Sequence, residues 1–214
     1  MPVRVLIVDD SHTARTLLIH MINASADMEV IGEAVNGSEA IELTHRLQPD
    51  VILMDITMPR MNGLEATEEI MNTRPTPIVL ISAGLEGKET EIAFQAMRLG
   101  ALTVLAKPVG INDPDHTRQV AALVSTVHAM AGVQVIHHRQ PRPLTRPKRH
   151  TTRPFVKGAP QLVGIVSSTG GPAALSEIIR RLPADFATPV VIVQHIAPDF
   201  LVSLTSWLDG LTPL

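Results

Sequence analysis

Five short apolar runs, each followed by a longer segment of helical period, are the feature that most constrains how this chain folds. The runs occupy residues 3–8, 29–34, 51–54, 78–81 and 102–106. Runs this short, rich in Val, Ile and Leu, are typical of strands buried on both faces, and the helical segments between them are typical of parallel crossovers. Residues 1–131 are therefore predicted to form a five-stranded, doubly wound parallel α/β domain.

Capping residues mark where several helices of this domain should begin. Ser11 and Asn36 can cap the first two helices, and Asp113, followed by Pro114 at the first helical position, can cap the last. The last helix would end at Gly132. Its apolar face would be formed by Val120, Leu123, Val124, Val127 and Met130.

Polar side chains stand at the carboxyl ends of four predicted strands. Asp9 and Asp10 follow the first strand, Asp55 the third, Ser82 the fourth and Lys107 the fifth. Ligands bind at this edge of open α/β sheets, where parallel strand ends meet. Three carboxylates in one pocket repel one another unless a cation joins them, and oxygen ligands favour Mg²⁺. A structural ion pair would explain any one of these residues, but four matching strand ends favour a functional pocket.

These residues resemble the response-regulator receiver domain over residues 1–131. The resemblance rests on Asp9-Asp10, the segment 55–63 with the sequence Asp-Ile-Thr-Met-Pro-Arg-Met-Asn-Gly, Ser82-Ala83 and Lys107-Pro108. It implies a CheY-like, flavodoxin-like fold. It also implies that Asp55 accepts a phosphoryl group from a histidine kinase, with charge neutralised by a cation and a lysine.

The resemblance also assigns roles to the other pocket residues. Ser82 and Lys107 would contact the phosphoryl oxygens. The implied Mg²⁺ ligands are Asp9, Asp10, Asp55 and the Thr57 carbonyl. One position departs from the family: three residues before the lysine, where the family usually has Tyr or Phe, this chain has Val104. We therefore expect phosphorylation to be signalled with weaker aromatic coupling, through Ser82 and the loop after it.

Charge separates a central segment from the rest of the chain. Residues 1–136 carry 9 basic and 17 acidic residues, whereas residues 137–160 carry 7 basic and none acidic. With recurring prolines and little to bury, residues 132–160 are predicted to be an extended linker. A nucleic-acid contact is the alternative. Because aromatic residues make up only 2% of the chain and no DNA-binding helix pair follows, we expect no nucleic-acid partner.

The remaining residues, 161–214, hold two further apolar runs that end in reactive side chains. Residues 162–166 lead into Ser-Ser-Thr-Gly-Gly-Pro at 167–172, then a helical stretch to Arg181, and residues 190–193 lead into Gln194-His195. A serine in such a strand-to-helix turn lies beside backbone N–H groups that can stabilise an oxyanion. A capped Ser-Gly turn or a passive phosphate loop is the alternative. A histidine at the next strand end favours Ser-His catalysis.

Residues 167–172 and Gln194-His195 resemble the catalytic domain of the CheB family of chemotaxis protein-glutamate methylesterases. Ser168 matches the nucleophile, His195 the general base, and Thr169 a neighbour that positions the site. The family hydrolyses glutamate methyl esters on chemoreceptors and deamidates certain glutamines. Phosphorylation by a chemotaxis histidine kinase relieves blockage of the active site by the receiver. The implied partners are this kinase and methylated chemoreceptors.

The second segment is short for a doubly wound hydrolase, so we expect only the first part of a second doubly wound domain, with an edge strand and apolar helix faces uncovered. The catalytic Asp of the family would lie beyond it; Asp199 and Asp209 follow His195 too closely to match, although Asp199 could serve as a local substitute. Either this is a piece of a longer product or the enzyme is degraded. The alternative function is a catalytically inactive receiver that acts as a phosphoacceptor.

Composition excludes several other classes. With no cysteine, the chain has no disulfide and no thiolate metal site. The apolar run at the start is too brief for an export signal, and no run approaches the roughly 18 residues of a membrane span. We therefore expect a cytoplasmic protein that is not embedded in a membrane.

Overall fold

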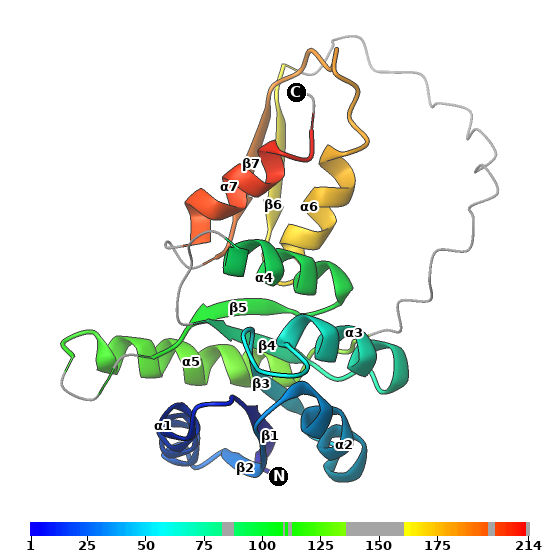
Figure 1. The fold of residues 1–214 in the computed structure, drawn as a ribbon. Coiled ribbons are helices and arrows are strands. Elements are labelled where there is room, and N and C mark those ends of the chain that lie inside the picture. Colours follow the sequence, from blue (N-terminus) through cyan, green and yellow to red (C-terminus); the bar gives the residue numbers. More distant parts are fainter. Residues whose placement is uncertain (83–87, 109, 111–112, 136–160, 197–199, 213–214) are drawn as a thin grey trace.

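One parallel sheet organises the first part of the chain in the computed structural model, which describes residues 1–82, 88–108, 110, 113–135, 161–196 and 200–212. Its strands are β1 (Val3–Val8), β2 (Met28–Ala34), β3 (Val51–Asp55), β4 (Ile78–Ser82) and β5 (Thr103–Ala106), in the order β2-β1-β3-β4-β5 (Figure 1). The predicted five-stranded, doubly wound class is confirmed. The strand order reverses between β1 and β3, which is where such sheets bind ligands.

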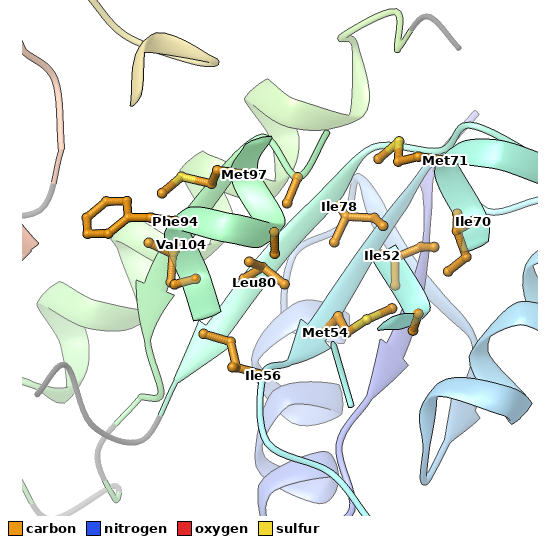
Figure 2. Packing of buried hydrophobic residues seen from close by; sticks show 14 of the residues in the cluster. Ile52, Met54, Ile56, Ile70, Met71, Ile78, Leu80, Phe94, Met97 and Val104 are labelled. Atoms are coloured by element: carbon orange, nitrogen blue, oxygen red, sulfur yellow. The ribbon is translucent and has the colours of Figure 1, made fainter. Parts of the chain in front are cut away.

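Helices cover both faces of this sheet. Helices α1 (His12–Asn23) and α5 (His116–Ala131) pack on one face, and α2 (Gly37–Leu47), α3 (Gly63–Thr73) and α4 (Lys88–Leu99) pack on the other. Because successive strand residues point to opposite faces, Leu53 packs with the first group while Met54 packs with the second. Figure 2 shows this second layer, in which Met54 and Leu80 of the sheet lie below Phe94 and Met97 of α4.

Two predicted caps are confirmed and one is wrong. The Ser11 hydroxyl accepts from the Ala14 N–H at the start of α1, and the Asn36 side chain accepts from the Glu39 N–H at the start of α2. Helix α5, however, begins two residues later than expected, with Asp115 at its N-cap. The reason is that Asp113 Oδ1 accepts from the Asp115 N–H and closes a turn before the helix. Helix α5 ends at Gly132 as predicted.

The C-terminal segment forms a second, smaller α/β unit. Strands β6 (Val163–Ser167) and β7 (Val190–Gln194) pair in parallel, with α6 (Gly171–Ile179) and α7 (Leu201–Asp209) beside them. Helix α6 ends two residues before the predicted end. One sheet face is bare: Val166, Val191 and Val193 are 82%, 49% and 57% exposed. The prediction of the first part of a second doubly wound domain is therefore confirmed.

The inner faces of α6 and α7 are covered, contrary to expectation, because they pack against α4 (Figure 1). Phe94 of α4 belongs to the same hydrophobic cluster as Leu175 of α6 and Leu204 of α7. The two units thus share part of one core. The predicted linker lies outside the described residues from 136 to 160, and within the described parts no helix is long and apolar enough to cross a membrane.

Candidate functional site

The carboxyl ends of β1, β3 and β5 bring together Asp9, Asp55 and Lys107. The Lys107 ammonium nitrogen lies 2.8 Å from Asp9 Oδ2 and 3.0 Å from Asp55 Oδ2. The side chains of Asp9 and Asp55 are 0% and 4% exposed, whereas that of Lys107 is 20% exposed. Two buried carboxylates therefore share one ammonium, and this corner of the sheet retains negative charge.

Burial and charge shift the acid–base properties of this pocket. Burial raises the pKa of Asp55 to about 6, and the nearby Asp9 charge adds to that rise, whereas Lys107 and the Thr57 N–H oppose it. Burial alone would lower the pKa of Lys107, but its contacts with Asp9 and Asp55 outweigh burial and hold that pKa above its ordinary value. A further cation in the pocket would therefore stabilise the charged form of Asp55.

The acidic residues of the pocket fit a magnesium ion. Asp9, Asp10 and Asp55 each offer a carboxylate oxygen within 4.8 Å of the others. Asp9 Oδ1 accepts from the Ser11 N–H at 2.9 Å, but within the described residues the buried Asp9 Oδ2 accepts no hydrogen bond and has only its ion pair with Lys107. Mg²⁺ prefers such hard oxygen ligands. The predicted Thr57 carbonyl ligand stays a prediction.

The loop after β3 folds tightly over Asp55. Gly63 donates its N–H to the Ile56 carbonyl at 2.9 Å. A Cβ atom at Gly63 would lie 2.3 Å from the Asp55 carbonyl oxygen, so no larger residue fits there. Asn62 and Glu65 form a capping box that starts α3 directly afterwards. These contacts hold the backbone of Asp55, the predicted phosphoacceptor, in place.

Ser82 and Val104 occupy the β4 and β5 side of the pocket. Ser82 is 1% exposed at the end of β4, and its carbonyl accepts from the Lys107 N–H at 2.7 Å. Val104 is 1% exposed and packs in the cluster that contains Phe94 (Figure 2). The structure thus brings all the predicted phosphorylation residues to one sheet edge, while their roles in phosphoryl transfer remain predictions.

Arg15 is a pocket residue that sequence analysis did not find. Its Nη1 donates to the carbonyl oxygens of Asp9 and Asp10 at 2.9 and 3.3 Å. Its Nε pairs with Glu33 at 3.3 Å, and the side chain is 11% exposed. An arginine on an amphipathic helix has no sequence pattern that separates such a contact from ordinary solvent exposure.

Ser168 and His195 follow β6 and β7, the two paired strands of the second unit. The His195 N–H donates to the carbonyl of Ser167, the last residue of β6, at 2.9 Å, which extends the ladder one residue past the end of β7. Ser168 Oγ lies 3.2 Å from His195 Nδ1, and both residues are exposed. This is within reach of a nucleophile and its general base. Two residues after the serine, Gly170 has a positive φ of 72°, which turns the chain into α6.

The third member of a catalytic triad has no candidate in the parts of the chain that the structure describes. No carboxylate in those parts forms an ion pair with His195. Asp209 lies at the end of α7, and Asp199, the proposed local substitute, lies outside the described residues. Thr169, whose predicted role in positioning the site stays a prediction, directs its hydroxyl to Met130 Sδ of α5 at 3.8 Å. The nucleophile loop therefore touches the first unit.

Comparison with known proteins identifies relatives of both units. A family model described as response regulator receiver domain matches residues 5–117, and one described as CheB methylesterase matches residues 163–214. The receiver match agrees with the acidic pocket, and the methylesterase match contains both Ser168 and His195.

Two curated relatives align with nearly the whole chain, and one solved structure aligns with its first part. Protein-glutamate methylesterase/protein-glutamine glutaminase 4 of Myxococcus xanthus is 42% identical, over 100% of this chain and 61% of that relative. The relative of the same name from Geobacter metallireducens is 44% identical, over 97% of this chain and 60% of that relative. The crystal structure of the response regulator domain of Thermotoga maritima CheB matches with a TM-score of 0.56 and 36% sequence identity, over 63% of this chain and 99% of that structure. The chain spans about three fifths of the curated relatives' length.

Proposed function

The chain belongs to the CheB family, as a receiver domain followed by part of a methylesterase region, and on this premise we propose that it is a phosphorylation-regulated protein-glutamate methylesterase. Its relatives are named protein-glutamate methylesterase/protein-glutamine glutaminase. The observation that carries the proposal is the 3.2 Å approach of Ser168 Oγ to His195 Nδ1 at adjacent strand ends. The division into a receiver (1–131), a linker (132–160) and a partial esterase domain (161–214) is part of the proposal.

The proposed reaction is acyl transfer in two steps. His195 accepts the proton of the Ser168 hydroxyl as Oγ bonds to the ester carbonyl carbon, and the same proton then leaves with methanol. His195 then takes a proton from water as the water oxygen bonds to the acyl carbon, and returns it to Ser168 Oγ as the acyl–serine bond breaks, which frees a glutamate carboxyl group that ionises. With a glutamine side chain the leaving group is ammonia instead. Backbone N–H groups at the start of α6 can stabilise the oxyanion in each step.

The receiver would control this reaction through Asp55. A carboxylate oxygen of Asp55 attacks the phosphorus of a phosphohistidine on a chemotaxis histidine kinase, and the imidazole leaves. Bound Mg²⁺, held by Asp9, Asp10 and Asp55, would neutralise the phosphoryl charge. We propose that Lys107 and Ser82 contact the phosphoryl oxygens.

Two contacts support regulation of the esterase by the receiver. Helix α4 packs on α6 and α7, and Thr169, next to the proposed nucleophile, contacts Met130 of α5. A receiver held by these contacts would restrict the access of a receptor helix to Ser168. We propose that phosphorylation of Asp55 loosens these contacts. Both proposed partners, the kinase and the methylated receptors, present cytoplasmic surfaces, so the chain would act in the cytoplasm.

A second candidate function is a phosphoacceptor without esterase activity. Two observations favour it: no described carboxylate supports His195, and one face of the β6–β7 sheet is bare. A Ser-His pair without its acid retains only part of the catalysis of a triad. The two candidate functions differ in whether the protein hydrolyses methyl esters through Ser168.

The test is methanol release from receptors that carry radiolabelled methyl esters. The wild-type chain is compared with Ser168→Ala and with Ser206→Ala, a matched control on the exposed face of α7. We expect release from the wild type and the control but not from Ser168→Ala. Equal release by all three proteins would refute the assignment of Ser168. No release from any of them, with Asp55 still phosphorylated, would favour the phosphoacceptor.

A further inference from the structure

Gln194, the last residue of β7, connects the two strand ends that carry Ser168 and His195. Its Nε2 donates to the Ser168 carbonyl at 2.8 Å and to the His195 carbonyl at 2.9 Å. Its Oε1 accepts from the Ser167 hydroxyl at 2.6 Å. One amide therefore binds the backbone of both proposed catalytic residues, which are 27 positions apart in the sequence.

The contacts of Gln194 admit only one orientation of its amide. With the amide reversed, its oxygen would face two carbonyl oxygens, so both donor contacts would become repulsive. The Ser167 hydroxyl, as a donor to Oε1, selects the same orientation. A glutamine is thus required for its two N–H groups and its oxygen together, and neither Glu nor Met offers that set.

Gly171 makes room for this amide at the start of α6. A Cβ atom at residue 171 would lie 1.9 Å from Gln194 Oε1 and 2.8 Å from the amide carbon. The second glycine of the Ser-Thr-Gly-Gly segment therefore lets the Gln194 side chain lie against the nucleophile loop. The Ser168 carbonyl also accepts from the Gly171 N–H at 2.8 Å, so both of its lone pairs are used.

Anchoring the Ser168 carbonyl also fixes the direction of the next N–H group. Peptide groups are planar and, as the structure has no cis bond in its described parts, trans. The Thr169 N–H accordingly points away from the side on which Gln194 holds the Ser168 carbonyl. In nucleophile turns of this kind, the N–H of the residue after the serine is the donor available to an oxyanion.

We propose that Gln194 is a positioning residue, which holds the Ser168 hydroxyl against His195 and orients the Thr169 N–H for the oxyanion. This inference rests on the proposed function and deepens it. Gln194 itself takes no part in proton transfer. Replacing Gln194 leaves Ser168 and His195 in the chain but lets the nucleophile loop shift. A misplacement of about 1 Å in an active site lowers reaction rates by about 100-fold.

The experiment measures how fast a fluorophosphonate reagent labels Ser168 in the 214-residue chain. Serine Oγ bonds to phosphorus, fluoride leaves, and the proton goes to His195. We expect Gln194→Glu and Gln194→Met to label about 10- to 100-fold more slowly than wild type, and Gln161→Glu, a matched exposed control, to label at the wild-type rate. Phosphorylation of Asp55 and the Trp207 emission maximum should stay unchanged in all variants, which shows that they fold.

Protonation supplies a rescue that a general loss of stability would not give. Below the pKa of the carboxyl introduced by Gln194→Glu, that carboxyl gains an O–H donor for one of the two carbonyls. The ratio of the labelling rate of this variant to that of wild type should therefore rise as the pH falls, whereas the ratio for Gln194→Met stays flat. The positioning role is refuted if wild type is labelled and both Gln194 variants are labelled as fast as wild type.

A second measurement decides the proposal even if wild-type Ser168 is not labelled, an outcome that counts against the esterase and not against Gln194. The ¹⁵N chemical shift of His195 Nδ1 reports its hydrogen bond with Ser168. We expect Gln194→Met to move this shift toward the value in Ser168→Ala, while Gln161→Glu leaves it in place. A wild-type shift in Gln194→Met would overturn the positioning role.

Discussion

The ring of Phe94 in α4 stacks on the ring of Trp207 in α7, with centroids 4.8 Å apart and planes 14° apart. Phe94 is fully buried, and the pair lies in the cluster that joins the receiver to the C-terminal unit. Trp207 is the single tryptophan of the chain, so all tryptophan fluorescence comes from this residue and is sensitive to its contact with Phe94.

Removing this stack should loosen the contact between the two units. Because Phe94 is fully buried, Phe94→Ala is expected to lower the free energy of unfolding by about 3 to 5 kcal/mol and to shift the Trp207 emission to the red. Denaturant unfolding followed by fluorescence measures both. Phe186→Ala, at a half-buried position outside the shared cluster, is the control and should leave the emission maximum unchanged. An unchanged emission maximum in Phe94→Ala would contradict the stacked contact.

Asp55→Asn should abolish labelling by a small-molecule phosphoryl donor with Mg²⁺. The amide lacks the nucleophilic carboxylate oxygen, although Lys107 and Asp9 remain in place. Labelling with a radioactive donor measures this directly, and Asp185→Asn, at an exposed position, should label like wild type. Full labelling of Asp55→Asn would remove the receiver assignment of this residue.

The raised pKa of Asp55 also predicts how stability depends on pH without metal. In the unfolded chain this carboxyl titrates near 3.8, whereas in the folded protein it titrates at about 6. Between these values the folded protein binds more protons, so its free energy of unfolding falls as the pH rises. In EDTA, the stability of wild type relative to Asp55→Asn should therefore decrease from pH 3.8 to about 6 and then level off. A relative stability that increases over this interval would contradict the burial of Asp55.

Arg15 should affect metal binding without touching the metal. Its guanidinium holds the Asp9 and Asp10 carbonyls, so Arg15→Met frees the loop that carries both carboxylates. We expect Mg²⁺ affinity to fall by about 10- to 100-fold, as when partners of metal ligands are removed. Calorimetric titration measures the affinity, and Arg118→Met, exposed on α5, is the control. Equal affinities of the two variants would exclude a positioning role for Arg15.

Lys107→Ala should separate phosphorylation from the response to it. Asp55 keeps its carboxylate, so labelling continues, but the ammonium that joins Asp9 to Asp55 is gone. We expect a phosphoryl donor to change Trp207 fluorescence in wild type and not in this variant. A full fluorescence change in labelled Lys107→Ala would argue against Lys107 as the phosphoryl contact that transmits the signal.

Sequence patterns were sufficient to predict the receiver fold and its acidic pocket. Buried strands appear in the sequence as short apolar runs. Because the ends of parallel strands meet at one edge of the sheet, Asp9, Asp55 and Lys107 come together regardless of the loop conformations. The start of α5 could not be predicted in the same way. Both Asp113 and Asp115 can cap a helix, and the choice depends on a local turn that the sequence does not reveal.

Contacts made by unremarkable residues were not predictable. Phe94 has the pattern of an ordinary core residue of α4, and its partner Trp207 lies in another unit, so nothing local connects them. Gln194 was visible as part of a motif, but its amide contacts require the register of β6 and β7. The covered faces of α6 and α7 were missed for the same reason, because helix amphipathicity shows that a face is buried and not what buries it.

Methanol release from methylated chemoreceptors, measured with and without a phosphoryl donor for wild type and Asp55→Asn, is the most direct test of a phosphorylation-regulated esterase. We expect the donor to accelerate release by wild type, Asp55→Asn to release methanol only at the basal rate, and Ser168→Ala to release none under either condition. Release that is independent of Ser168, or that the donor accelerates equally in Asp55→Asn, would contradict the proposed function.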